Sequence, residues 1–155
     1  MNTIQFYKAN GTYGFLSNLF KASIIVDDRE FPTAEHAYQY AKFTDKKAAE
    51  WAMQAPSAHL VAIVAHGLFA WDIIEHWAAI KVDRMRKVVL AKFSQHDDLR
   101  QRLWATGDAH LVEASRTDAF WGIGKKGNGQ NMLGKVLMET RAAVGLKWQM
   151  AGSGA

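Results

Sequence analysis

The sequence predicts a single α+β domain, mostly helical, with a small antiparallel sheet. A chain of 155 residues suits one domain, and its 49% of hydrophobic residues is enough for one sizeable core. Short strand-like segments are confined to residues 1–31 and 111–114. Apolar residues at helical spacing fill much of the remainder, which is why helices dominate the prediction.

The N-terminal region contains three expected strands. Ile4–Tyr7 is the first, and Ser23–Val26 and Arg29–Phe31 are expected to form a hairpin around Asp27 and Asp28. The turn-rich segment Asn10–Gly14 separates the first strand from the hairpin. These segments account for the small antiparallel sheet.

Helices are expected over most of the remaining chain. Thr33 and Ser57 are suitable N-cap residues, and Gly107 and Gly145 follow predicted helix ends. The predicted helices are Ala34–Phe43, Asp45–Gln54, Ser57 to about Gly67, Trp77–Phe93, Asp97–Ala105 and Asn131–Val144, with a strand at Leu111–Ala114. We expect one domain over residues 1–148 and a flexible tail over 149–155. Trp51, Trp71 and Trp104 are expected in the core.

Composition excludes several classes of protein and site. The chain has no cysteine, which excludes disulfides, thiolate metal sites and a cysteine nucleophile. Its six histidines lack metal-binding spacing, so no metal is expected. The N-terminus lacks a secretory pattern and no apolar run is long enough to cross a bilayer, so we expect a cytoplasmic protein without a membrane partner. The net charge of +4 suits an anionic partner or a solvated basic face.

The predicted helix after Pro32 carries a polar stripe. Glu35, Gln39 and Lys42 share one face, whereas most other residues of this helix are apolar or aromatic. The stripe faces either a cavity, where burial would tune its pKa values, or solvent, where the contacts would be ordinary. Spacing alone leaves both interpretations open.

A glycine-rich loop precedes the last predicted helix. Gly122, Gly124, Gly127 and Gly129 lie beside Lys125 and Lys126, ahead of a helix N-terminus that favours anions. The loop is interpreted as a phosphate cradle or as a flexible surface turn; it lacks the ending of a Walker motif. A second turn-rich segment, Tyr13 to Asn18, places Ser17 and Asn18 beside aromatic residues, as ligands or as turn-forming residues.

An ordered set of motifs runs through nearly the whole chain. They are Phe6-Tyr7, Tyr13-Gly14-x-x-Ser17-Asn18, Phe31-Pro32-Thr33-Ala34-Glu35-His36 with Gln39 and Lys42-Phe43, Met85, Ala91-Lys92-Phe93-x-Gln95, Leu99-Arg100, Leu111-Val112-Glu113, Asp118-x-x-Trp121-Gly122-x-Gly124, Gly127-x-Gly129-x-Asn131-x-Leu133-Gly134 and Met138-Glu139-x-Arg141. In this order they resemble the YbiA-like, or NADAR, family of N-glycosidases.

The resemblance implies an N-glycosidase fold and activity. Members of the family cleave the C–N bond of phosphoribosylamino-pyrimidine intermediates of riboflavin synthesis, and others remove ADP-ribose from the amino group of guanine. It implies catalytic roles for Glu35, Lys42 and Asp118, and substrate binding by Trp121. Residues expected to line the substrate site around them are Gly122, Gly124, Gly127, Gly129, Asn131, Ser17, Asn18, Tyr13 and Gln39.

This sequence departs from the family pattern in two places. Ala34 stands where a serine is common, and Leu68 follows Gly67 where an arginine is frequent. The stretch from Pro56 to Trp77 matches the family least. If that arginine contacts a phosphate in other members, its absence implies that the anionic end of the substrate differs for this protein.

The implied reaction sets requirements on the site. Breaking an N-glycosidic bond builds positive charge on the sugar, so the site needs negative charge, a proton donor and an activated water. Glu35 and Asp118 are the expected carboxylates, and Lys42 is either a nucleophile forming a Schiff base or a partner that orients Glu35. Hydrolysis requires neither a cofactor nor a metal.

The expected partner is a phosphate-bearing ribosyl substrate, free or on nucleic acid, and the sequence does not indicate an oligomeric state. Two other classes remain open. One is a non-catalytic module that binds ADP-ribose or a nucleotide. The other is a nucleic-acid-binding protein that uses basic residues of the longest helix, Arg84, Arg86, Lys87 and Lys92, although their spread around the helix favours a solvated surface.

Overall fold

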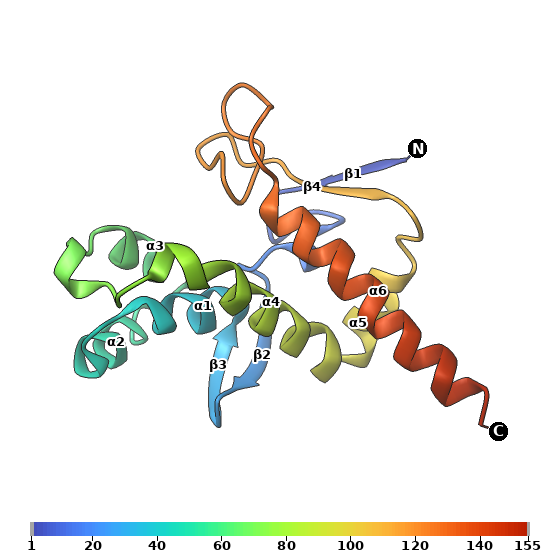
Figure 1. Cartoon of the computed structure of the whole chain (residues 1–155), viewed down its shortest axis with the longest axis horizontal. Helices are drawn as coiled ribbons and strands as arrows, with labels where there is room; N and C mark the ends of the chain where they lie inside the picture. The colour runs from blue at the N-terminus through green and yellow to red at the C-terminus, as the bar shows by residue number, and fades with distance from the viewer. Residues whose placement is uncertain (1, 155) are drawn as a thin grey trace.

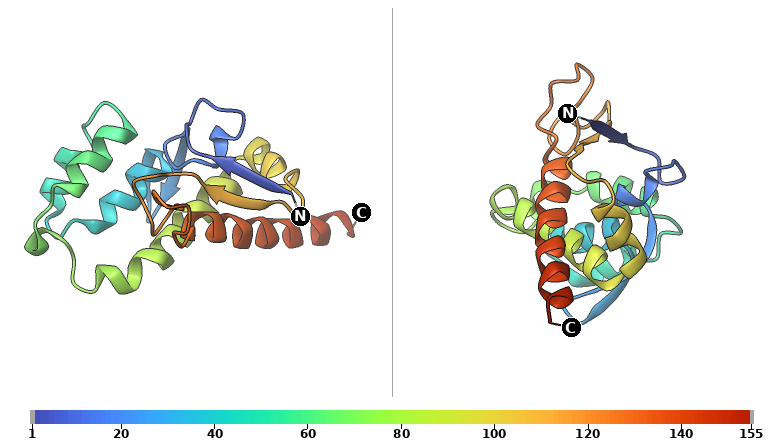
Figure 2. Two further views of the ribbon diagram at one scale, coloured as in Figure 1. Left: turned by 90° about the horizontal axis from the view of Figure 1, so that it is seen from above. Right: turned by 90° about the vertical axis from the view of Figure 1, so that its right-hand side faces the viewer.

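The computed structural model describes residues 2–154, apart from the side chain of residue 148. Its framework is a pair of packed helices, α4 (Trp77–Gln95) and α6 (Met132–Gly152). One short sheet lies beside α6 and another beside α4, and the first three helices gather at the opposite end from the C-terminus (Figure 1). The view from above shows an elongated molecule with this helical group at one end (Figure 2).

The hairpin forms as the sequence predicts. Strands β2 (Lys21–Val26) and β3 (Arg29–Thr33) pair in antiparallel register. Asp27 and Asp28 have φ values of 51° and 62°, which is the geometry of a two-residue type I′ turn. The carboxylate of Asp27 pairs with Arg84 at 2.7 Å and with Lys87, both on α4, and so ties the turn to the central helix.

A second sheet joins distant parts of the chain. β1 (Thr3–Phe6) pairs in parallel with β4 (His110–Glu113), with Thr3 opposite His110 and Phe6 opposite Glu113. The sequence predicts both strands but not their pairing, because a parallel pair is closed by a long crossover rather than by a local turn. This pairing brings the segment after β4 towards the first helix.

The helices of the first two thirds begin and end close to the predicted positions. They are α1 (Ala34–Lys42), α2 (Lys46–Ala52), α3 (Ala58–His66) and α5 (Asp97–Trp104), with 3₁₀ turns η1 (Gly14–Leu16) and η2 (Ala70–Asp72) that the sequence did not indicate. Thr33 and Ser57 cap α1 and α3 as expected, each accepting a backbone N–H at 3.2 Å.

The last helix is longer than predicted. It was expected to end at Val144, with Gly145 just beyond and a flexible tail over 149–155, but α6 continues to Gly152. Gly145 is a packing position: a Cβ there would lie 1.9 Å from Cζ3 of Trp104, so glycine allows α5 to contact α6. The last residue of the predicted tail, Ala155, lies outside the described residues.

The main core lies between α4, α5, α6 and the parallel strands, with Phe93, Leu103, Leu111 and Leu137 fully buried. The expectation that three tryptophans belong to the core is wrong. Trp51, Trp71 and Trp104 are 65%, 74% and 45% exposed. Ring size alone predicted burial, whereas Trp51 on α2 and Trp71 on η2 are mostly exposed, and Trp104 on α5 contacts Gly145 of α6 but remains partly exposed. Over residues 2–154, no helix combines the length and the apolar character needed to span a bilayer.

Candidate active site

The largest concentration of polar residues surrounds a cavity of about 740 Å³. It lies between α1, α3, the start of α4, the segment after η1, and the loop that joins β4 to α6. The residues that line it are Tyr7, Ser17, Asn18, Leu19, Glu35, Tyr38, Gln39, Lys42, His59, Ala62, Ile63, His66, Ile73, Trp77, Lys81, Met85, Glu113, Ser115, Thr117, Asp118, Phe120, Trp121 and Leu133. Three carboxyl groups and two lysines therefore share one space.

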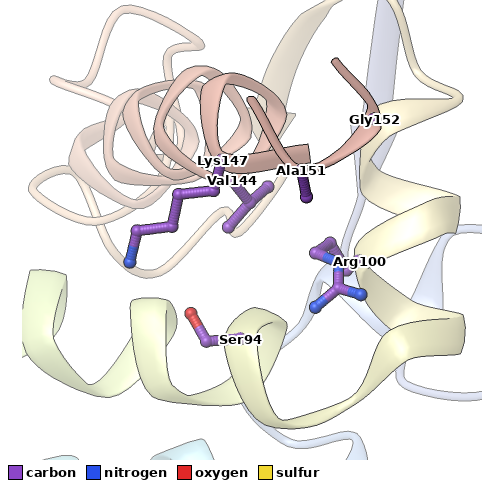
Figure 3. A pocket seen from close by; sticks show the side chains of 6 residues that line it. All are labelled: Ser94, Arg100, Val144, Lys147, Ala151 and Gly152. Atoms are coloured by element: carbon purple, nitrogen blue, oxygen red, sulfur yellow. The ribbon is translucent and has the colours of Figure 1, made fainter. Parts of the chain in front are cut away.

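A second cavity, of about 470 Å³, lies between α4, α5 and α6 (Figure 3). Its lining residues are Ser94, Arg100, Val144, Lys147, Ala151 and Gly152. It contains none of the residues that the sequence analysis singled out and no carboxylate. The larger cavity is therefore the candidate active site.

The polar stripe of α1 faces this cavity, which decides between the two interpretations of its spacing. Gln39 Nε2 donates to Glu35 Oε1 at 2.8 Å, and the Glu35 backbone N–H donates to the Asn18 carbonyl at 3.1 Å. Burial raises the pKa of Glu35, and the nearby Asp118 charge raises it further, against the hydrogen bond from Gln39 and the charge of Lys42. Gln39 is buried, and its Oε1 has no hydrogen-bond partner among the residues that the structure describes.

Lys42 extends from the last turn of α1 towards α3. Its Nζ donates to the Ala65 carbonyl at 3.0 Å, and no ion pair within 4.0 Å joins it to Glu35 among the described residues. Burial lowers the pKa of Lys42, and the charge of Lys81 lowers it further while Glu35 opposes both. The neutral amine is therefore more populated at Lys42 than it is at a fully exposed lysine.

Asp118 and Trp121 reach the cavity from the loop after β4. Asp118 Oδ1 accepts the backbone N–H groups of Phe120 at 2.9 Å and Trp121 at 2.7 Å, which orients the carboxylate and shapes the turn. The ring of Trp121 stands edge-on to Tyr38, with centroids 5.6 Å apart, and to Phe120 at 4.9 Å. The three aromatic rings form an apolar wall beside the carboxylates.

Glu113, at the end of β4, is an acid of the cavity to which the sequence analysis assigned no role. Its side chain is 8% exposed. Burial, with the charges of Asp118 and Glu35, raises the pKa of Glu113 to about 8, although a backbone hydrogen bond from Ser115 acts in the opposite direction. One sequence signal could have found it: a carboxylate that ends the apolar strand Leu111-Val112 must be buried with it.

The structure places the glycines of the predicted phosphate cradle, Gly122, Gly124, Gly127 and Gly129, outside the cavity lining. The N–H groups of the last three donate to the carbonyls of Ser115, Gly124 and Ile123 at 2.7–3.2 Å. The N–H groups that begin α6, at Met132 and Leu133, donate to the carbonyls of Phe120 and Trp121. These donors are used inside the loop, so they are not available to an anion.

The glycines instead allow the loop to fold tightly on itself. Gly124 and Gly127 have positive φ values of 69° and 73°. A Cβ at Gly129 would lie 2.6 Å and 2.7 Å from the carbonyl oxygens of Gly122 and Ala119.

Asn131, which is predicted to contact substrate, also lies outside the cavity lining. Its side chain accepts the Glu113 N–H and donates to the Leu111 carbonyl, both at 2.9 Å, so it holds the loop against β4.

Ser17 and Asn18 reach the cavity as predicted, whereas Tyr13 does not. Tyr13 lies on the turn before η1, with its ring 6.5 Å from that of Phe15, and Tyr7 lines the cavity in its place. The segment around Ser17 is supported from beneath by Lys92. Lys92 is 1% exposed, and its Nζ donates to the carbonyls of Phe15 at 2.6 Å and Ser17 at 2.9 Å.

The expectation that Lys92 belongs to a solvated basic surface is wrong. Its Nζ is buried and donates to two backbone carbonyls instead of to water. Burial lowers the pKa of Lys92 to about 7. The three other basic residues of that set are paired with acids: Arg84 and Lys87 with Asp27, and Arg86 with Asp83 and Glu139. These pairs neutralise much of the face that the nucleic-acid interpretation requires.

Basic groups reach the cavity from α3 and α4. Lys81 lines it and its Nζ lies 3.8 Å from the centroid of the Phe120 ring, and His59 and His66 line it from α3. Over residues 2–154, no group of three histidine, aspartate or glutamate side chains is placed to hold a metal ion. The arrangement supplies carboxylates, a partly buried amine, stacking surfaces and a basic edge.

Comparisons with known proteins show what the chain as a whole is similar to. The NADAR domain pattern matches residues 5–144. The chain is 38% identical over 144 residues to N-glycosidase YbiA of Escherichia coli (strain K12), covering 93% of this chain and 89% of that protein. It is 39% identical over 138 residues to the riboflavin biosynthesis protein VVA0006 of Vibrio vulnificus, covering 89% of this chain but 37% of that longer protein. The NMR structure of E. coli YbiA superimposes with a TM-score of 0.86 at 37% identity, covering 96% of this chain and 88% of that one.

Proposed function

The chain belongs to the NADAR family and is a YbiA-type N-glycosidase, and from this premise we propose that its cavity hydrolyses the bond between a ribose carbon and an amino nitrogen on a nucleobase-like ring. The observation that carries the proposal is the convergence of Glu35, Asp118 and Lys42 beside Trp121 in one cavity. Two carboxylates, an amine of lowered pKa and an aromatic wall match the requirements of N-glycoside cleavage.

The carboxylates stabilise the positive charge that develops on the sugar. Asp118 is oriented by two backbone N–H groups, so it presents a fixed negative charge to the cavity. Glu35 is held by Gln39, and its raised pKa suits a base that accepts a proton from water. Trp121 offers its ring to the base or the ribose.

Lys42 acts as the nucleophile in this proposal. Its amine adds to ribose C1 in the ring-opened form, the substrate nitrogen leaves with its electron pair and a proton, and a Schiff base remains. Water then adds to C1, and the sugar is released as the amine is regenerated. The orienting role for Lys42 receives less support, because its Nζ contacts the Ala65 carbonyl and no ion pair with Glu35 is present among the described residues.

The phosphate end of the substrate lies towards Lys81, His59 and His66 in this proposal. These residues form the basic edge of the cavity, whereas the N–H groups of Gly124, Gly127 and Gly129 already donate to carbonyls within the protein. Two substrate classes share the required C–N bond and phosphate. One is a phosphoribosylamino-pyrimidine, which the relative named for riboflavin biosynthesis supports. The other is guanine that carries ADP-ribose on its amino group.

A product assay separates these possibilities. Purified protein is incubated with each substrate class in parallel, and products are identified by mass spectrometry, with a Glu35→Gln variant as the inactive control. Release of the free base-like amine from either substrate supports the proposal and identifies the class. Tight binding without turnover of either substrate by the unaltered protein would instead support a non-catalytic nucleotide-binding module.

A further inference from the structure

Glu113 is a buried acid that none of the steps above employs. It ends β4, lines the cavity, and its backbone is held on both sides: its N–H donates to Asn131 Oδ1 at 2.9 Å, and its carbonyl accepts the Ile123 N–H at 3.0 Å. Two independent contacts thus hold the residue where the strand enters the loop. A rigidly placed carboxyl group in a cavity is what proton transfer requires.

The surroundings of Glu113 favour its neutral form. The titratable and charged groups around the cavity are Glu35, Tyr38 and Lys42 from α1, Lys81 from α4, His59 and His66 from α3, Asp118 from the loop, and Tyr7 after β1. None of the cationic groups forms an ion pair with Glu113 within 4.0 Å in the described part of the chain. Two other carboxyl groups, from Asp118 and Glu35, act on it electrostatically.

The three carboxyl groups are held differently. Asp118 receives two backbone N–H donors and Glu35 receives the Gln39 amide, and such donors stabilise a carboxylate. Glu113 receives one backbone N–H, from Ser115, and is the acid whose pKa rises to about 8. Carboxyl groups that share a site divide into one that keeps its proton and others that ionise. Glu113 is the one that keeps it.

We propose that Glu113 is the proton donor to the departing nitrogen, an assignment that rests on the proposed N-glycosidase function. The bond between ribose C1 and the nitrogen breaks, its electron pair stays on the nitrogen, and the carboxyl proton of Glu113 moves to that nitrogen. The base-like amine leaves neutral and Glu113 becomes a carboxylate. The Lys42 Schiff base then occupies C1; water adds to this carbon, its proton passes to Glu35, and the bond between C1 and the Lys42 nitrogen breaks to release the sugar and the free amine. Exchange with solvent returns the proton to Glu113 and removes it from Glu35. Glu113 also precedes the loop that carries Trp121, so acid and stacking ring belong to one segment.

The first test is the pH profile of kcat/KM with a substrate whose leaving group is an amine. In the unaltered protein the rate should fall above about pH 8, as Glu113 loses its proton. Glu113→Gln keeps the shape but cannot donate an acid proton. We expect kcat/KM to fall by about 10²- to 10³-fold and the alkaline fall to disappear. Glu139→Gln, on the exposed outer face of α6, should match the unaltered protein.

The second test changes the leaving group. An N-ribosyl 4-nitroaniline can open its ring and has an electron-poor nitrogen that leaves with little help from an acid, so Glu113→Gln should cleave it within about tenfold of the unaltered protein. If the protein does not cleave that compound, the fall of kcat/KM above about pH 8, here called the alkaline limb, decides whether Glu113 is the proton donor. Retention of that limb in Glu113→Gln, or an equal loss of rate with both leaving groups, overturns the assignment. An unaltered protein that cleaves no N-riboside overturns the proposed function itself.

A third measurement is independent of substrate. Because the folded-state pKa of Glu113 lies above its unfolded value, the native protein binds the extra proton, and stability falls as pH rises from about 4.5 to about 8. Glu113→Gln should reduce this slope in thermal unfolding, and an unchanged slope counts against a neutral Glu113. If Glu113→Gln does not fold, Glu113→Asp serves: it should retain the alkaline limb at a lower rate.

Discussion

The two sides of the cavity are built differently. One side consists of α1, β4 and the loop after it, and it is continuous with the cores, where Ala34, Ala37 and Leu111 are fully buried. The other side consists of α3 and of Ile73, which follows η2. Helix α3 lies at the end of the molecule away from the C-terminus (Figures 1 and 2). On that side Ile63, Phe69 and Trp71 are exposed, and the rings of the last two stack on each other with centroids 4.7 Å apart.

The chemistry lies on the well-packed side. All three carboxyl groups and Trp121 belong to it, whereas α3 supplies Ile63, the two histidines and the Ala65 carbonyl. This second side falls in the segment 56–77, which the sequence motifs predict to match the family least. Reacting groups need fixed positions, while a lightly packed wall can change residues at little cost in stability. We therefore expect the wall to determine which substrate enters and the packed side to determine the reaction.

The strongest test of this division is Glu35→Gln. The substitution keeps the shape and the position on α1 but removes the charge. We expect kcat to fall by about 10²-fold or more, with the melting temperature little changed, because the effect is electrostatic. Turnover near that of the unaltered protein would transfer the principal role to Asp118.

Lys42 tests whether the end of α1 takes part in covalent chemistry. Borohydride added during turnover should trap a sugar on Lys42, seen as a mass increase of the peptide that contains it. Lys42→Ala should lose nearly all activity, and Lys42→Arg should yield no adduct. Substantial activity of Lys42→Arg without any adduct would favour the orienting role, and a fully active Lys42→Ala would contradict both roles.

Substitutions in the glycine loop should lower the free energy of unfolding more than they lower substrate affinity. At Gly129 an added Cβ would meet backbone oxygens at 2.6 Å and 2.7 Å, so Gly129→Ala should cost about 3 kcal/mol of unfolding free energy. At Gly127 the space is open and only the positive φ opposes a side chain, so Gly127→Ala should cost about 1 kcal/mol. Urea unfolding measures both. If either variant has normal stability but loses affinity for phosphate, the interpretation of the loop as a phosphate-binding site would be supported instead.

The wall should give the smallest effect. Ile63 lines the cavity but is exposed, so Ile63→Ala removes contact with substrate and little core packing. We expect KM to change by about threefold to tenfold, kcat by less than twofold, and stability by less than about 1 kcal/mol. A large fall in kcat with unchanged KM would show that α3 positions the reacting groups as well.

Local patterns predicted that Glu35, Gln39 and Lys42 share one face of α1, but left open whether that face meets a cavity or solvent. The spacing of Glu35, Gln39 and Lys42 follows the helical period, and the Thr33 cap depends only on neighbouring residues. The rest of the site depends on distant partners. The glycine loop turns inward because carbonyls such as that of Ser115 accept its N–H groups, and Lys92 is buried because two carbonyls near η1 surround it. No periodicity in the sequence encodes such pairings.

The parallel pair β1–β4 has a consequence for how the enzyme comes into being. Thr3 pairs with His110, more than a hundred positions later in the chain. Glu113, Asp118 and Trp121 reach their final positions only after this strand pair and the start of α6 have formed. Contacts so far apart in sequence make closure slow relative to the local helices. During synthesis, α1 with Glu35 and Lys42 emerges early, but catalytic competence arrives only after most of the chain has left the ribosome. An incomplete chain therefore carries the amine and one acid without the means to use them.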